Sequence, residues 1–216
     1  MIAAVIFDMD GVLVDTEQVW ESVREQLVTD WGGRSVPGAQ RTMMGMSSGE
    51  WSRYMHDELG LAASPAEINA EVVRRMLERY RQELPLIDGA VAAVERLAVV
   101  FPLAVASSSN RPLIDTVLAT AGITECFATT VSSEEVARGK PSPDVYIEAA
   151  RRLGTTPVQC AAIEDSASGI RAAHAAGMRV LAFPNAHYPP AAEALALADV
   201  VLETLDGLTP SLVAGA

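Results

Sequence analysis

The sequence has no long hydrophobic run, and no stretch approaches the ~18 uninterrupted apolar residues of a membrane-spanning helix. The apolar residues at the start, 1–7, lack the basic residues and the length of a secretory signal peptide. We therefore expect a cytoplasmic protein with no membrane partner.

Cysteine is scarce as well. The two cysteines, Cys126 and Cys160, lie in apolar surroundings and have no metal-ligand partners at the spacing of a zinc site. We expect two small buried thiols in a reducing compartment and no disulfide framework.

Basic residues are few: the sequence has 16 basic and 28 acidic residues, which gives a net charge of −12. A field of that sign repels nucleic acid and anionic lipid, so neither is an expected partner. Among the basic residues only Lys140 is a lysine. Either a codon bias left one lysine by chance, or Lys140 occupies a position where arginine would not serve.

Half of the residues are hydrophobic and a fifth are charged, which is the composition of a globular chain. Apolar runs that end in polar residues are typical of strands buried on both faces of a parallel sheet, and they occur at 3–7, 103–106, 127–131, 161–163, 180–183 and 199–202. Helical periodicity occurs between them, at 90–100, 112–121, 143–153 and 168–176. The alternation predicts an α/β fold with a doubly wound parallel sheet.

Residues 16–84 interrupt this alternation and carry helical periodicity alone. Helices are expected there at 18–30, 49–59 and 64–83, the last of them opened by a capping box. We therefore predict a core domain made of residues 1–15 and 85–216, with an all-helical cap domain, residues 16–84, inserted into it. A chain of 216 residues suits such an arrangement, and we expect a monomer.

Acidic residues follow two of the predicted strands. Asp8 and Asp10 precede Gly11, which favours a turn, and Glu164 and Asp165 follow another apolar run. A solvated turn at the first pair and a helix N-cap at Asp165 are the alternatives. If the two strands are neighbours, three or four carboxylates converge, which is too costly in Coulomb terms without a divalent cation. Oxygen ligands suit Mg²⁺, so the pattern predicts a magnesium site.

Polar residues also mark a possible anion site. Ser107, Ser108 and Asn110 lie between an apolar run and a helix, where hydroxyl groups and free N–H groups bind anions. Lys140 lies on a loop that contains two prolines. Near clustered carboxylates, its ammonium group would balance their charge and bind a phosphate oxygen.

Taken in order, these segments resemble the haloacid dehalogenase (HAD) superfamily of phosphotransferases over the whole chain, and most closely its subgroup of beta-phosphoglucomutase and sugar-phosphate phosphatases. The matching segments are DMDGVLVDTE from residue 8, a serine after the second strand, GKPSPD from residue 139 and EDSASGI from residue 164. The resemblance implies that Asp8 is the nucleophile that becomes an aspartyl-phosphate and that Asp10 is the general acid and base. It also implies that Ser107 and Lys140 bind the phosphate.

The same resemblance implies a Mg²⁺ cofactor. Its expected ligands are Asp8, the backbone carbonyl of Asp10, Asp165 and, directly or through water, Glu164. The expected function is therefore a magnesium-dependent phosphomonoester hydrolase (phosphatase) acting on a small phosphorylated metabolite such as a sugar phosphate. A beta-phosphoglucomutase-like hexose-phosphate mutase is the alternative.

Several residues depart from other branches of the superfamily. Trp20, Met44 and Ser48 stand where the mutases have a histidine and basic residues. The cap contains no lysine, which excludes the Schiff-base chemistry of phosphonoacetaldehyde hydrolases. The presence of Asp10 argues against the haloacid dehalogenases proper, which lack it and need no magnesium.

The cap loop 45–49 is the expected specificity segment, because in this superfamily it reaches toward the substrate. Gly45 and Ser48 are its predicted substrate contacts. Arg41 and Arg53 lie near enough in sequence to substitute for the basic residues that a mutase needs. A binding protein that keeps the fold without turnover is a further alternative, and the complete set of acidic residues with Lys140 argues against it.

Overall fold

The computed structural model describes residues 1–185 and 187–215. In these residues, six strands form one parallel sheet in the order β3-β2-β1-β4-β5-β6. The strands are β1 (Ala4–Phe7), β2 (Leu103–Ser107), β3 (Phe127–Ser132), β4 (Cys160–Glu164), β5 (Arg179–Ala182) and β6 (Val200–Val201). The predicted parallel sheet is confirmed.

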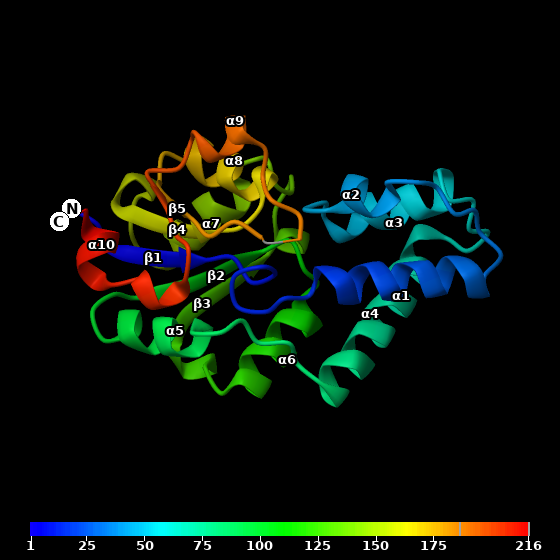
Figure 1. Cartoon of the computed structure of the whole chain (residues 1–216), viewed down its shortest axis with the longest axis horizontal. Helices are drawn as coiled ribbons and strands as arrows, with labels where there is room; N and C mark the ends of the chain where they lie inside the picture. Colours follow the sequence, from blue (N-terminus) through cyan, green and yellow to red (C-terminus); the bar gives the residue numbers. More distant parts are fainter. Residues whose placement is uncertain (186, 216) are drawn as a thin grey trace.

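The helices of the core alternate with these strands, as Figure 1 shows. They are α5 (Ala90–Ala98), α6 (Arg111–Ala121), α7 (Asp144–Arg152), α8 (Ala167–Ala175), α9 (Ala192–Leu195) and α10 (Pro210–Ala214). Short 3-10 helices occupy η1 (Thr124–Cys126), η2 (Ser133–Glu135), η3 (Pro157–Gln159) and η4 (Leu205–Gly207).

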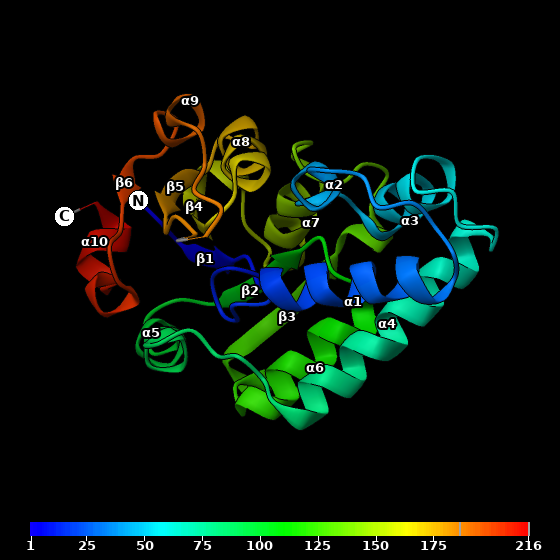
Figure 2. The same ribbon diagram turned by 45° about the vertical axis from the view of Figure 1, so that its right-hand side comes forward.

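The central strands are buried on both faces because their side chains alternate between two hydrophobic clusters. In β1, Val5 and Phe7 belong to the cluster that α5 and α6 cover. Ala4 and Ile6 belong to the cluster that α7 and α8 cover. Figure 2 shows these two pairs of helices on opposite sides of the sheet. Burial on both sides explains why the strands appear in the sequence as continuous apolar runs.

The strand order reverses at β1, because β2 and β3 lie on one side of it and β4, β5 and β6 on the other. In open parallel sheets, ligands bind in the crevice beyond the carboxyl ends of the strands at such a reversal. The residues that follow β1 and β4 therefore lie at the favoured position for a site.

The segment between β1 and α5 is helical and lies beyond the carboxyl end of β1 (Figure 1). Its helices are α1 (Glu17–Asp30), α2 (Ala39–Met43), α3 (Ser48–Asp57) and α4 (Pro65–Gln82). Ser64 and Glu67 form the predicted capping box at the start of α4, which satisfies backbone groups that the first turn leaves unpaired. We call α1–α4 the cap; the predicted domain bounds, 16–84 against the rest, stay a prediction.

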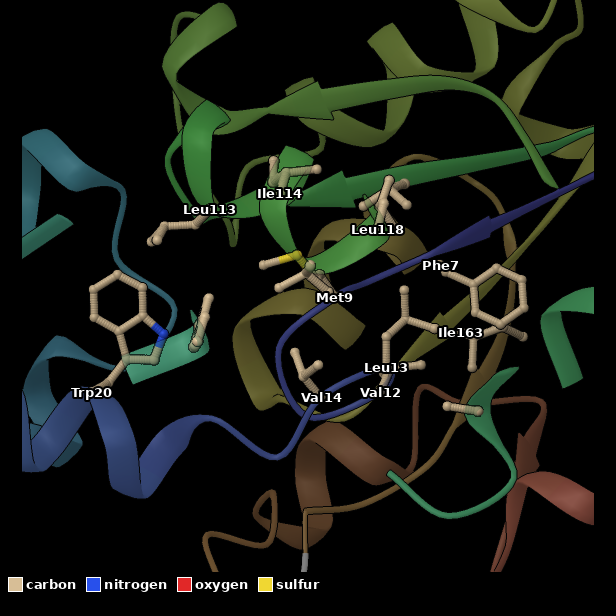
Figure 3. Close-up of a cluster of buried hydrophobic side chains, with 14 of the residues drawn as sticks. Phe7, Met9, Val12, Leu13, Val14, Trp20, Leu113, Ile114, Leu118 and Ile163 are labelled. Carbon is tan, nitrogen blue, oxygen red and sulfur yellow. The ribbon is translucent and has the colours of Figure 1, made fainter. Parts of the chain in front are cut away.

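Two backbone connections join the cap to the sheet, and they run side by side. The Asp15 N–H donates to the carbonyl of Pro85 at 2.8 Å, and the Ile87 N–H donates to the carbonyl of Leu13 at 3.0 Å. Val12, Leu13 and Val14 are fully buried, and Figure 3 shows Val12 and Leu13 near Ile163 of β4. This packing anchors the base of the cap to the core.

Some predicted elements differ from the structure. The short helices α2, α9 and α10 were not predicted, because four or five residues are too few for a hydrophobic period to emerge. The strand expected at 199–202 is limited to β6, which lies at the edge of the sheet. The helix expected at 143–153 is α7, for which Pro143 is the N-cap, and the Ser142 hydroxyl donates to Asp144.

Two further observations concern burial. Cys160 is buried as expected, whereas Cys126 is only partly buried. Within the described ranges, no helix is both long enough and apolar enough to cross a membrane.

Candidate active site

Three carboxylates converge at the carboxyl ends of β1 and β4. The Asp8 N–H donates to the carbonyl of Ile163 at 3.0 Å, which aligns the ends of the two strands. Each of Asp8, Glu164 and Asp165 offers one oxygen, and these atoms all lie within 4.8 Å of one another. All three side chains are buried. The two acidic segments predicted to meet therefore do so.

Lys140 lies between two of these carboxylates. Its Nζ atom is 3.0 Å from Asp8 Oδ1 and 2.6 Å from Glu164 Oε1. The Tyr146 hydroxyl donates to the same Glu164 oxygen at 2.7 Å, and Ser166 donates to the other through its backbone N–H and its hydroxyl, both at 3.1 Å. Burial would lower the pKa of Lys140, but Asp8 and Glu164 outweigh this and raise it above its ordinary value.

The cluster carries more negative than positive charge. Burial raises the pKa of Asp8, and Lys140 opposes this rise while Glu164 adds to it. Burial, together with the charges of Glu164 and Asp8, also raises the pKa of Asp165. Asp165 Oδ1 is buried and has no hydrogen-bond partner among the residues that the structure describes. A free carboxylate oxygen beside other oxygen donors fits a hard divalent cation such as Mg²⁺.

Two glycines permit this close approach. Gly11 has a φ of 81°, and a Cβ atom there would lie 1.9 Å from Asp165 Oδ2. A Cβ atom on Gly169, in the first turn of α8, would lie 1.7 Å from Glu164 Oε1. Any larger residue at either position would therefore displace a carboxylate of the cluster.

Asp10 is turned toward the base of the cap. Its Oδ2 atom accepts a hydrogen bond from the Ser109 hydroxyl at 2.7 Å. Its Oδ1 atom accepts from the Thr16 hydroxyl at 2.5 Å and from the Trp20 indole N–H at 3.1 Å. The Asp10 side chain therefore joins residues of the core to the first helix of the cap.

A cavity of about 50 Å³ lies between the core and the cap. The core lines it with Asp8, Asp10, Ser108, Ser109, Lys140, Asp165 and Ser166. The cap lines it with Glu17, Trp20, Arg24, Met43, Met44, Gly45, Met46 and Trp51. Residues of the core that are expected to bind phosphate and residues of the cap therefore line the same cavity.

The predicted substrate-binding residues divide into two groups. Lys140, Ser108 and Gly45 line the cavity, and the Ser108 hydroxyl donates to the backbone carbonyl of Gly45 at 3.2 Å. Ser107 is fully buried, and its Oγ atom accepts the Ser109 N–H at 3.0 Å. The substrate-binding roles of these residues stay predictions.

The second group contacts Glu134, outside the lining of the cavity. Ser48 of α3 and Asn110, just before α6, donate to the same Oε1 atom of Glu134 at 3.0 and 2.7 Å. These two residues thus take part in a contact between cap and core, and their predicted contact with substrate is also untested.

Several lining residues were not singled out in the sequence, among them Glu17, Arg24, Trp51 and Ser109. Arg24 offered one signal: it lies four residues after Trp20, on the helical face that also carries Leu27, so a charged residue falls within an apolar stripe. Arg41 and Arg53, the cations considered for the cap, are exposed and are not part of the cavity lining.

Known proteins share this arrangement. Residues 5–183 match the family of haloacid dehalogenase-like hydrolases. The chain is 31% identical to hexitol phosphatase B of Escherichia coli K12 over 218 residues, covering 96% of this chain and 95% of that one. It is 30% identical over 205 residues to a bifunctional riboflavin kinase/FMN phosphatase of Arabidopsis thaliana, covering 94% of this chain but 53% of the longer protein.

The fold comparison agrees. The structure of CbbY from Rhodobacter sphaeroides in complex with phosphate is similar with a TM-score of 0.87 and 25% identity, covering 99% of this chain and 100% of that one. A family match that spans most of the chain, together with a core sheet and a helical cap of the same kind, confirms the resemblance seen in the motifs. The chain belongs to the haloacid dehalogenase-like hydrolases.

Proposed function

We propose that the protein is a magnesium-dependent phosphatase that hydrolyses a small sugar or polyol phosphate through an aspartyl-phosphate on Asp8. The observation that carries the proposal is the placement of Asp8, which is held by Lys140 at 3.0 Å and lines the cavity between core and cap beside Asp165. The names of the relatives, hexitol phosphatase among them, support the substrate class.

Asp8 is the proposed nucleophile. Lys140 holds its Oδ1 atom, which leaves Oδ2 to attack the phosphorus atom. As the bond from Oδ2 to phosphorus forms, the bond from phosphorus to the leaving oxygen breaks. The Lys140 ammonium group stabilises the charge on the transferring phosphoryl oxygens, and the buried Glu164 fixes the position of that ammonium group.

Asp10 is the proposed general acid and base. It gives a proton to the leaving oxygen in the first step. In the second step it takes a proton from a water molecule, whose oxygen attacks phosphorus and breaks the bond to Asp8 Oδ2. The hydrogen bonds from Ser109, Thr16 and Trp20 hold the Asp10 carboxyl group at the entrance to the cap.

The buried carboxylates fit a magnesium ion, as the unpartnered Asp165 oxygen indicates. Asp8, Asp165 and the backbone carbonyl of Asp10 would hold it, with Glu164 direct or through water. When bound, Mg²⁺ would neutralise negative charge on the transferring phosphoryl group. Among the cap residues, Trp20 and Trp51 add apolar surface to the cavity lining.

The test is an assay of phosphate release from a chromogenic phosphomonoester, with Mg²⁺ and with EDTA. Asp8→Asn should fold, as judged by its melting temperature, yet release no phosphate. Asp15→Asn is the matched control, because Asp15 is exposed and lies in the same loop. Substantial turnover by Asp8→Asn, or full activity in EDTA, would contradict the proposal.

A readout independent of activity tests the metal site. A ligand that binds only the folded protein raises its melting temperature. Mg²⁺ should therefore raise the melting temperature of the wild-type protein, and Asp165→Asn should abolish that rise. An equal rise in both proteins would place the metal elsewhere.

A further inference from the structure

Three polar side chains of the cap, linked by hydrogen bonds, lie beside the catalytic cavity. The Gln40 side chain of α2 donates through Nε2 to Glu17 Oε2 at 3.3 Å and accepts through Oε1 from Arg24 at 3.0 Å. These two bonds fix the orientation of the amide, because only its nitrogen can face the carboxylate and only its oxygen the guanidinium. Glu17 and Arg24, two turns apart on α1, both line the cavity that Asp8 lines.

Arg24 is an unusual residue in this position. It is 6% exposed, and its guanidinium carbon lies 4.6 Å from the ring centre of Trp20 and 5.2 Å from that of Trp51. Its Nε atom is buried and lacks a hydrogen-bond partner in the part of the chain that the structure describes. Burial lowers the pKa of Arg24 to about 10, so the group is still a cation at neutral pH. A buried, incompletely bonded donor at a cavity wall indicates that a ligand completes its bonding.

The charge of the cavity limits what that ligand can be. Among the described residues, its lining carries four carboxyl groups and two cationic groups, namely Asp8, Asp10, Glu17, Asp165, Arg24 and Lys140. With Mg²⁺ bound and all four carboxyl groups ionised, the lining carries no surplus positive charge before the phosphate enters. A second anionic group at the cap end would lie near Glu17 and Asp10, so the charges disfavour it.

A hydroxyl group suits the same pair of side chains. A hydroxyl donates one hydrogen bond and accepts others, so it can donate to a carboxylate and accept from a guanidinium. Burial raises the pKa of Glu17 to about 7, and its carboxyl group accepts hydrogen bonds in either protonation state. The indole rings of Trp20 and Trp51, which line the same cavity, add apolar surface for the carbon chain of the ligand.

We propose that Glu17 and Arg24, joined by Gln40, form a hydroxyl-binding site that selects an uncharged, hydroxylated leaving group. The proposal rests on the proposed phosphatase function, and it adds the residues that would recognise the hydroxyl groups of the substrate. An alkyl phosphate would leave Glu17 and Arg24 without a hydrogen-bond partner. The second negative charge of a phosphorylated acid would be repelled by Glu17.

Matched esters test the site. The three-carbon set is glycerol 3-phosphate, propyl phosphate and 3-phosphoglycerate, and the six-carbon pair is sorbitol 6-phosphate and hexyl phosphate. In at least one set, kcat/KM should be higher for the hydroxylated, singly phosphorylated ester than for its alkyl partner. The expected ratio is roughly 10- to 150-fold for each lost hydrogen bond to a charged group. 3-Phosphoglycerate should be a poorer substrate than glycerol 3-phosphate.

Variants test whether Glu17 and Arg24 cause the preference for hydroxylated esters. Arg24→Met and Glu17→Leu should bring the ratio of hydroxylated to alkyl ester toward one, because neither new side chain forms a strong hydrogen bond to a hydroxyl group. Arg53→Met and Glu25→Leu are matched controls, since both residues are exposed cap residues outside the cavity lining, and they should keep the ratio. If Arg24→Met does not fold, Glu17→Leu carries the test, because it removes the acceptor oxygens and keeps a side chain of similar size.

Two outcomes would overturn the hydroxyl site while leaving the phosphatase function intact. One is turnover of a chromogenic ester with no preference between hydroxylated and alkyl esters. The other is a preference for 3-phosphoglycerate that Arg24→Met abolishes, which would make Arg24 a ligand for a second anion. Absence of turnover on every ester would contradict the phosphatase function itself. Calorimetric binding of the same esters to Asp8→Asn then decides the hydroxyl preference without turnover.

Discussion

Lys140 donates a 2.6 Å hydrogen bond to Glu164, and both side chains are almost completely buried. Lys140 Nζ is also 3.0 Å from Asp8 Oδ1, so the bond to Glu164 fixes the ammonium group beside the proposed nucleophile. Removing one partner of such a buried pair leaves an uncompensated charge, which costs about 3–5 kcal/mol in folding stability.

Lys140→Arg should therefore lose most of the activity. A planar guanidinium is larger than an ammonium group and cannot occupy the same point between two carboxylates. Overpacking should also lower stability by about 1–3 kcal/mol. Phosphate release and thermal melting measure the two effects. Arg138→Lys is the control, because Arg138 is exposed and pairs with Asp144 at the surface. Wild-type rates in Lys140→Arg would mean that the single lysine has no special role.

Asp10→Asn should lose roughly 10²–10⁴-fold in turnover, because an amide cannot transfer the proton. The variant should still bind Mg²⁺, since the expected ligand is the backbone carbonyl. Single-turnover kinetics and a Mg²⁺-dependent melting shift separate the two functions. Loss of metal affinity with the chemistry intact would show that the assignment is wrong.

Gly169→Ala should be inactive and destabilised. The new Cβ atom would lie 1.7 Å from Glu164 Oε1, so the carboxylate would have to leave Lys140 and Tyr146. Gly49→Ala is the matched control in another helix, where a Cβ atom meets nothing within 4 Å. That change should stabilise the protein by about 0.4–1 kcal/mol. Equal melting temperatures for the two variants would contradict the close packing at Gly169.

Glu17 should make stability depend on pH. Burial, with a further contribution from Asp10, raises its pKa from the ordinary 4.5 to about 7, while Arg24 opposes the rise. Because the folded-state pKa is the higher one, this group's contribution to stability is fully present below pH 4.5 and is lost as the pH rises to about 7. The melting temperature of Glu17→Gln relative to wild type should therefore increase between pH 5 and 8, whereas Glu25→Gln should show no such trend.

The protein should release phosphate to water and not transfer it within a sugar. A mutase must bind a second phosphate with cations of the cap, and Arg41 and Arg53 are exposed and outside the cavity lining. Arg24 does line the cavity, but Gln40 links it to the Glu17 carboxyl group, which disfavours a second anion there. Incubation with beta-glucose 1-phosphate and a trace of glucose 1,6-bisphosphate should yield free phosphate, if this sugar is accepted, without accumulation of glucose 6-phosphate. Rapid formation of glucose 6-phosphate would favour the mutase alternative.

Much of the core was predictable from local patterns. Strands buried on both faces appear as apolar runs, and acidic residues at their ends mark the carboxyl edge of the sheet. Asp8 and Glu164 therefore indicated a shared site before any packing was known. Short elements such as α2 and β6 were missed or overextended, because a few residues carry too little periodicity to define their ends.

The sequence by itself determined the α/β core, the helical insertion and the two acidic segments at strand ends, since each depends on residues close together in the chain or on one repeated pattern. The pairing of β1 with β4 then brought the two acidic segments together. Only the tertiary structure decided what the cap presents to the cavity. Packing of cap helices against one another buries Arg24 beside the indole rings of Trp20 and Trp51, and contact between the cap and the core directs Ser48 to Glu134. The contacts of Arg24 with Trp51 and of Ser48 with Glu134 join residues distant in sequence, so no local periodicity encodes them. Burial then determines which hydrogen bonds these side chains make and shifts the pKa of Arg24.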